Sequence, residues 1–245
     1  MKPSTTVICA VYSKDIDRHA LLAQHAANLA KQTRPVESIY IFENGDMPPS
    51  NLEGELLVSS KPLTIYEAWN LALSACRTPL VMNLNLDDRL NIDAIELLEN
   101  SIIEHDAGLV AGDWKICHSQ EEANDVAKCF PAGSIPITPD WPPKIGTTTR
   151  IGSGTSHDVT YGPATMWQMS AHLGFPRYPY RTTDDYRIRG IADGVWWRIL
   201  EEHLQKQMIR LPTIIGNYCS HPDTQAEFRV FNEWGRINNL TISPL

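Results

Sequence analysis

Basic residues are scarce in this chain. Its 245 residues include 21 Lys and Arg against 29 Asp and Glu, so the formal net charge is −8. A protein that binds nucleic acid by neutralising backbone phosphates usually carries the opposite sign, so this balance argues against a nucleic-acid partner. A ligand that bears phosphate would need a metal ion or a local basic patch beside this protein.

Paired cysteines and long apolar runs are missing as well. The five cysteines are odd in number and no two form a C-x-x-C pair, which argues against a disulfide scaffold and a structural zinc site. No stretch approaches the ~18 consecutive apolar residues of a membrane-spanning helix, and the N-terminus does not read as a signal peptide. We therefore expect a cytoplasmic protein with reduced thiols, and peripheral contact with the inner face of the cell membrane is left open.

Several common catalytic and nucleotide-binding motifs are also absent from the sequence. It contains no P-loop, no G-x-S-x-G and no H-E-x-x-H pattern. The run Gly152-Ser153-Gly154 lacks the third glycine and the preceding strand of a dinucleotide-binding fingerprint.

The apolar residues that are present follow two periods. Short continuous runs predict buried strands at residues 7–11, 38–42, 55–59, 79–84, 108–114 and 208–215. Helical spacing predicts helices at residues 15–31, 64–76, 91–102 and 191–205, with Thr64 and Glu67 as a capping box and Asn91 as a cap. This alternation predicts a single α/β domain with a central, mostly parallel sheet flanked by helices. Residues 118–165 are rich in Pro, Gly, Ser and Thr, and predict a loop-rich extension.

Polar side chains follow three of the predicted strands. Tyr12 comes after the first strand, Glu43 after the second, and Asn85 to Asp88 after the fourth. Because ligands of parallel sheets bind outside the carboxyl ends of the strands, we expect these residues to converge at one edge. Tyr12 could stack on a base, with Glu43 accepting from a base or ribose, although Tyr12 also suits an ordinary edge aromatic.

The Asp87-Asp88 pair is the sharpest chemical signal in the sequence. Adjacent carboxylates repel each other unless a cation lies between them, and hard oxygen ligands suit Mg²⁺ or Mn²⁺ that bridge to substrate phosphates. The alternative is that Asp88 only opens the following helix, where acids in the first turn favour the helix dipole.

Two downstream residues are further candidates. Asp193 lies in the first turn of a predicted helix, where it is either a general base that faces a cleft or an acid that stabilises the helix start. His221 follows the last predicted strand, where it either completes a metal site or is an ordinary surface histidine.

Taken together, these motifs resemble the family-2 glycosyltransferases, which have the GT-A fold. The resemblance is good over about residues 5 to 118 and looser over 160 to 225. It rests on these segments: Tyr12-Ser13, Lys31 to Thr33, Asn44-Gly45, Ala68 to Asn70, Asn85 to Leu90 and Ala192 to Arg198. It implies transfer of a sugar from a nucleotide-diphosphate donor, usually with a divalent metal, to a glycan or lipid-linked acceptor in surface polysaccharide biosynthesis. It also implies a nucleotide-sugar-binding half at 1–118 and an acceptor-side half of the same domain at 119–245.

The resemblance also implies roles for individual residues. Tyr12 and Glu43 fall where the family holds the nucleobase, and Asn85 and Asp87 fall on its D-x-D motif, which binds metal, diphosphate and ribose. Asp88 and His221 match residues that contact metal or diphosphate in some relatives. Asp193 falls on the acid taken as catalytic base in inverting members.

Two departures from the family pattern leave an alternative open. Asn85 stands where the first acid of the D-x-D motif is expected, and Ala192 stands where a Glu commonly precedes the base. These residues favour a non-catalytic GT-A-like module that binds a nucleotide or glycan. A sugar-phosphate nucleotidyltransferase is a third and weaker interpretation, because the first strand is followed by Tyr12 and Ser13 rather than a glycine-rich loop.

Overall fold

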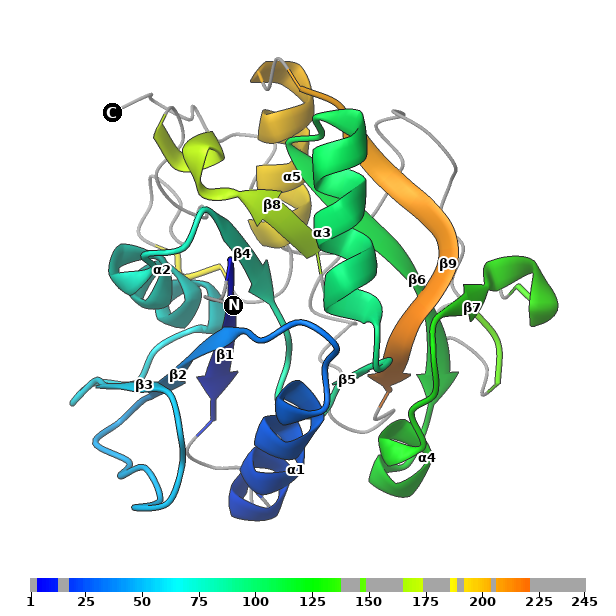
Figure 1. Ribbon diagram of the computed structural model, residues 1–245. Coiled ribbons are helices and arrows are strands. Elements are labelled where there is room, and N and C mark those ends of the chain that lie inside the picture. The colour runs from blue at the N-terminus through cyan, green and yellow to red at the C-terminus, as the bar shows by residue number, and fades with distance from the viewer. Residues whose placement is uncertain are drawn as a thin grey trace.

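The computed structural model describes residues 4–12, 18–137, 146–148, 165–173, 186–188, 192–203 and 206–220. Their main feature is one large mixed sheet with helices packed against it (Figure 1). No helix among these residues is long and apolar enough to span a bilayer.

Among the described residues the sheet has nine strands, most of them parallel. The four at one side, β3-β2-β1-β4, are parallel neighbours, and β8 runs antiparallel between β4 and β6. Beyond β6 lies the parallel strand β9, to which the short strands β5 and β7 pair in antiparallel fashion. The strands are β1 (Thr5–Val11), β2 (Glu37–Phe42), β3 (Glu55–Val58), β4 (Leu80–Asn83), β5 (Arg89–Leu90), β6 (Leu109–Cys117), β7 (Phe130–Pro131), β8 (Thr165–Gln168) and β9 (Met208–Cys219).

Apart from the short helix at Gln120–Asn124, the helices form where the apolar spacing predicts them. They are α1 (Arg18–Ala30), α2 (Ile65–Ala75), α3 (Ala94–His105), α4 (Gln120–Asn124) and α5 (Ala192–His203), with short 3₁₀ turns η1 (Ala132–Ser134) and η2 (Met169–Leu173). Both halves of the predicted capping box are present at α2, where Thr64 accepts from the backbone of Glu67 and Glu67 accepts from the backbone of Thr64.

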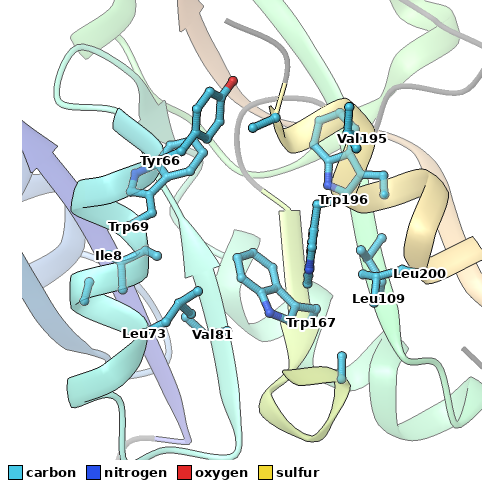
Figure 2. Packing of buried hydrophobic residues seen from close by; sticks show 14 of the residues in the cluster. Ile8, Tyr66, Trp69, Leu73, Val81, Leu109, Trp167, Val195, Trp196 and Leu200 are labelled. Atoms are coloured by element: carbon cyan, nitrogen blue, oxygen red, sulfur yellow. The ribbon is translucent and has the colours of Figure 1, made fainter. Parts of the chain in front are cut away.

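Side chains along the buried strands point alternately to the two faces of the sheet, and this divides the core between those faces. Ile8 belongs to a cluster with residues of α2 and α5, whereas Val7 and Cys9 face clusters that include residues of α3 and α1. Figure 2 shows the first cluster, with Tyr66 and Trp69 of α2 on one side and Val195 and Trp196 of α5 on the other. One face therefore brings the starts of α2 and α5 together.

The prediction of the α3 cap was wrong. The helix begins at Ala94 after Asp93, and the side chain of Asn91 instead donates to the carbonyl of Ile214 over 3.1 Å and accepts from the N–H of Ala127. Asn91 thus joins β9 to the segment after α4, because a buried amide must satisfy both its donor and its acceptor.

The second half of the chain has more regular structure than its composition suggests. The expected loop region contains α4, β7 and η1, and β8 supplies an antiparallel strand in the middle of the sheet. The last strand runs on to Cys219, four residues beyond its predicted end at Ile215. This extension carries β9 to the polar turn that follows β4.

Candidate functional site

The structure brings three of the predicted polar strand ends to one edge of the sheet. Val11 and Phe42 are register partners, so Tyr12 and Glu43 leave neighbouring strands side by side. Strand β4 pairs with the other side of β1, and its continuation donates from Leu84 N to Ile8 O over 3.1 Å before the Asn85–Asp88 turn.

Tyr12 and Glu43 differ sharply in their exposure. Tyr12 is 57% exposed, whereas Glu43 is only 5% exposed and accepts a hydrogen bond from the N–H of Leu63 over 3.3 Å. After Glu43 the backbone reverses through Asn44 and Gly45, both with positive φ, a conformation that Asn and Gly adopt at least cost. The neighbouring strand ends thus carry an exposed aromatic residue and a carboxylate that is held by the segment leading into α2.

The Asn85–Asp88 turn folds back on itself and is covered by β9. The N–H of Asp88 donates to the carbonyl of Asn85 over 3.2 Å. The Asp88 side chain is fully buried, and its Oδ1 accepts from the N–H of Cys219 over 3.0 Å. Asp87 is only partly buried, and its carbonyl accepts from Nε2 of Gln120 in α4 over 3.2 Å.

Two side-chain oxygens of this turn are buried without a hydrogen-bond partner among the described residues. They are Oδ1 of Asn85 and Oδ2 of Asp88. Such orphaned acceptors are costly in a folded protein and call for an explanation such as a water or an ion.

The surroundings of the turn disfavour the ionised form of Asp88. Burial first, and the neighbouring charge of Asp87 second, raise the pKa of Asp88 well above its usual range, while the Cys219 N–H and Arg89 act in the opposite direction. Arg89 is itself buried, and it directs Nη1 at the carbonyls of Leu86 and Asp88. The guanidinium therefore braces the backbone of the turn more than it pairs with its carboxylates.

These oxygens suit a hard divalent cation. Within the part of the chain that the structure describes, no group of three or more His, Cys, Asp or Glu side chains is arranged to hold a metal. Mg²⁺ and Mn²⁺ do not require such a cage, because they are commonly bound through one or two carboxylates together with substrate phosphates. The orphaned oxygens of Asn85 and Asp88, beside Asp87, fit that mode of binding.

Asp193 lies in the first turn of α5, on the face of the sheet that α2 also covers. Its Oδ1 accepts from the hydroxyl of Tyr66 over 3.1 Å and from the N–H of Gly194 over 2.8 Å. Burial of the carboxyl raises the pKa of Asp193, and these two donors oppose the rise. A carboxylate with a raised pKa is suited to receiving a proton near neutral pH.

One predicted site residue, His221, lies outside the described residues. Sequence reasoning in turn missed three residues that the structure adds: Tyr66 against Asp193, Gln120 against Asp87, and Arg187, which pairs with Glu67 of α2. No local pattern marks these contacts, since the partners are 127, 33 and 120 residues apart.

Solved structures of other proteins have the same fold, and one of them is a mannosyltransferase. The fragment 1–349 of S. aureus TarS matches with a TM-score of 0.61 at 14% identity, covering 98% of this chain and 67% of that one. The same fragment in complex with UDP-GlcNAc gives a TM-score of 0.59 at 12% identity, covering 98% and 68%. The mannosyltransferase PcManGT from Pyrobaculum calidifontis, in complex with GDP-Man and Mn²⁺, gives 0.60 at 12% identity.

The similarity to these structures concerns the fold. The chain covers 61% of the length of the mannosyltransferase, with 95% of its own residues matched. No protein-family model and no curated protein matches the sequence. The structures confirm the predicted resemblance to glycosyltransferases and the α/β fold with a central, mostly parallel sheet flanked by helices.

Proposed function

We propose that the protein is a glycosyltransferase that moves a sugar from a nucleotide-diphosphate sugar to an acceptor hydroxyl. The observation that carries this proposal is the Asn85–Asp88 turn, with its orphaned buried oxygens, beside Tyr12 and Glu43 at the carboxyl edge of the sheet. Ligands of such sheets bind at this edge. Complexes of the same fold with UDP-GlcNAc and with GDP-Man and Mn²⁺ support a nucleotide-sugar donor.

In this proposal the donor nucleotide lies across the strand ends. Tyr12, which is exposed, stacks on the base, and Glu43 accepts a hydrogen bond from the base or the ribose. Asn85 and Asp87 act as a D-x-D-like motif facing the ribose and diphosphate. The exposure of Tyr12 supports this role because more than half of its surface is accessible to a ligand.

Asp87 and Asp88, with His221, are proposed to hold Mn²⁺ or Mg²⁺. When bound, the cation supplies positive charge that offsets the charge of the leaving diphosphate. The residues of the chain supply oxygens from a turn that is already braced by Arg89 and Cys219. Little reorganisation would then be needed to accept the ion.

Asp193 is proposed as the general base. The acceptor oxygen attacks the anomeric carbon, the bond from that carbon to the diphosphate oxygen breaks with its electron pair, and the hydroxyl proton passes to the Asp193 carboxylate. A single displacement of this kind inverts the anomeric configuration.

The finer assignments follow from the sequence resemblance and belong to the proposal. They are a family-2-like enzyme, a hexose as the transferred sugar, and a glycan or lipid-linked acceptor in surface polysaccharide biosynthesis. The division into a donor half at 1–118 and an acceptor half at 119–245 is part of the same proposal, as is the cytoplasmic location with peripheral membrane contact.

Nucleotide binding provides the first test. Calorimetric titration with UDP, GDP and CDP, each with and without Mn²⁺, should give binding of at least one nucleotide that weakens when EDTA is added. Asp87→Asn should lose the metal-dependent part of the affinity. Asp193→Asn should keep nucleotide binding but abolish sugar transfer. Failure of all three nucleotides to bind in the presence of Mn²⁺ would refute the proposed donor.

A non-catalytic GT-A-like module that binds a nucleotide or glycan is the second candidate. The observation that favours it is the burial of Asp88, whose Oδ1 is already bonded to Cys219 N–H as in a purely structural acid. Hydrolysis of a nucleotide sugar by the wild-type protein, but not by Asp193→Asn, would eliminate this candidate.

A further inference from the structure

The hydroxyl of Tyr66 joins α2 to the proposed base on α5. It donates to Oδ1 of Asp193 over 3.1 Å, and the N–H of Gly194 donates to the same oxygen over 2.8 Å. Within the described part of the chain, both hydrogen bonds of Asp193 therefore end on one oxygen. This arrangement fixes the plane of the carboxylate and directs one edge of it away from its donors.

Tyr66 is held rigidly enough to impose an orientation. It is 3% exposed, and its ring packs edge-on against Trp69 with centroids 5.5 Å apart. In Figure 2 the ring of Tyr66 lies beside Trp69 in the cluster shared by α2 and α5, and its hydroxyl points away from Ile8. The helix that carries it begins at a complete capping box formed by Thr64 and Glu67, so the first turn cannot fray easily.

Two charged groups near this contact, Glu67 and Arg187, bind each other. Glu67, one residue along α2, pairs with Arg187, which also donates to the carbonyl of Pro62 over 2.9 Å. Among the described residues, the donors to the Asp193 carboxylate are neutral: a phenol and a backbone amide. A neutral donor stabilises a carboxylate without neutralising it, which suits a group that must later take up a proton.

We propose that Tyr66 is a positioning residue, whose hydroxyl orients the carboxylate of Asp193 and stabilises its ionised form. This role rests on the proposed function of Asp193 as the general base. Tyr66 remains protonated throughout and takes no proton from the acceptor. Because burial alone raises the pKa of Asp193, loss of the Tyr66 hydrogen bond raises that pKa further.

The test compares Tyr66→Phe with Tyr40→Phe. Both variants remove one buried phenol oxygen, but the hydroxyl of Tyr40 lies 3.1 Å from Nδ1 of His25 and serves as a control away from Asp193. The first readout is the carboxyl titration of Asp193 followed by ¹³C NMR, with the signal assigned by its absence in Asp193→Asn. We expect a higher midpoint in Tyr66→Phe and the wild-type midpoint in Tyr40→Phe.

The second readout is sugar transfer. Tyr66→Phe should lower kcat by about 10-fold or more, leave the nucleotide Kd unchanged, and move the acid limb of the pH–rate profile to higher pH. An unchanged Asp193 titration in Tyr66→Phe, or an unchanged kcat and acid limb, overturns the proposal. Tyr66→Phe could shift the Asp193 titration while the wild-type protein transfers no sugar from any donor. That result overturns the proposed function, and the catalytic role of Asp193 with it, while the hydrogen bond itself stands.

A second measurement covers the case in which Tyr66→Phe fails to fold. Wild-type protein labelled with fluorotyrosine has more acidic phenols, which donate stronger hydrogen bonds. The Asp193 midpoint should then fall below that of unlabelled protein. An unchanged midpoint in the labelled protein overturns the proposal.

Discussion

The backbone N–H of Cys219 donates to the buried Oδ1 of Asp88 over 3.0 Å, joining the end of β9 to the turn after β4. Residues 131 positions apart therefore shape one acidic turn. The contact gives Asp88 a structural task in addition to its proposed place beside a cation. The two tasks use different oxygens, because Oδ2 is the atom without a partner among the described residues.

Asp88→Asn should separate the charge of this residue from its hydrogen bond. The amide oxygen can still accept from Cys219, but the buried charge is gone. The folded protein raises the pKa of Asp88, so it keeps a proton that the unfolded chain releases near pH 4. The stability that this proton confers is present below that pH and is lost as the pH rises. Metal-free wild-type protein should therefore lose stability relative to Asp88→Asn as the pH rises above about 4.

Urea unfolding in EDTA measures this difference at several pH values. Asp88→Ala, which removes the acceptor as well, should lose about 1–3 kcal/mol even at low pH because the Cys219 N–H is left unpaired. Parallel stability curves for wild type and Asp88→Asn would contradict the assignment of a raised pKa.

Tyr12→Ala should weaken nucleotide binding with little effect on folding. The ring is 57% exposed, so its removal costs few core contacts. Stacking of a base on an aromatic ring contributes about 1–3 kcal/mol, and the nucleotide Kd should rise roughly 5- to 150-fold. Calorimetry with the nucleotide that the wild type binds provides the measurement, and Tyr12→Phe should retain most of the affinity. Equal affinity of Tyr12→Ala and wild type would remove Tyr12 from the site.

Replacing only one partner of the Arg210–Asp113 ion pair should lower the free energy of unfolding considerably. The side chains are 4% and 2% exposed, and Nε of Arg210 donates to Oδ1 of Asp113 over 2.7 Å. Asp113→Leu or Arg210→Met alone leaves an uncompensated buried charge, for which about 3–5 kcal/mol is typical. The double variant should lose much less than the sum. Urea unfolding of the four proteins gives the coupling energy, and additive losses would show that the pair does not act as a unit.

The sequence indicated the parts of the fold that depend on local patterns. The apolar run at 7–11 and the capping box at Thr64 and Glu67 became β1 and the start of α2, because burial and capping are decided within a few residues. Strand β8, at Thr165–Gln168, was not predicted. Its four residues mix apolar and polar side chains beside a loop-rich segment and show no periodic pattern. They form a strand only because they pair with β4 and β6.

The candidate site likewise has a part that could be predicted from the sequence and a part that could not. The convergence of Tyr12, Glu43 and the Asn85–Asp88 turn could be predicted, because parallel strands end at a common edge. The Tyr66 contact to Asp193 could not, since it depends on how α2 and α5 pack on one face of the sheet. Asn91 shows the limit most clearly. Its side chain suits a helix cap, but it bonds instead to the carbonyl of Ile214 in β9 and to the N–H of Ala127 after α4.

Gly216→Ala should destabilise the protein from a position next to the site. A Cβ at Gly216 would meet the carbonyl of Arg89 and would lie 2.7 Å from the ring of Trp114, so β5 and β9 could no longer approach as they do. Neither neighbour is the end of a flexible chain, and overpacking of this kind typically costs about 1–3 kcal/mol. Gly133→Ala is the matched control, because nothing lies within 4 Å of a Cβ there. Thermal and urea unfolding should show a loss for Gly216→Ala alone. Since the carbonyl of Arg89 directly follows the Asp87-Asp88 pair, metal-dependent nucleotide affinity should also fall in Gly216→Ala. If this variant kept both its stability and its nucleotide affinity, β9 would be able to move away without disturbing the turn.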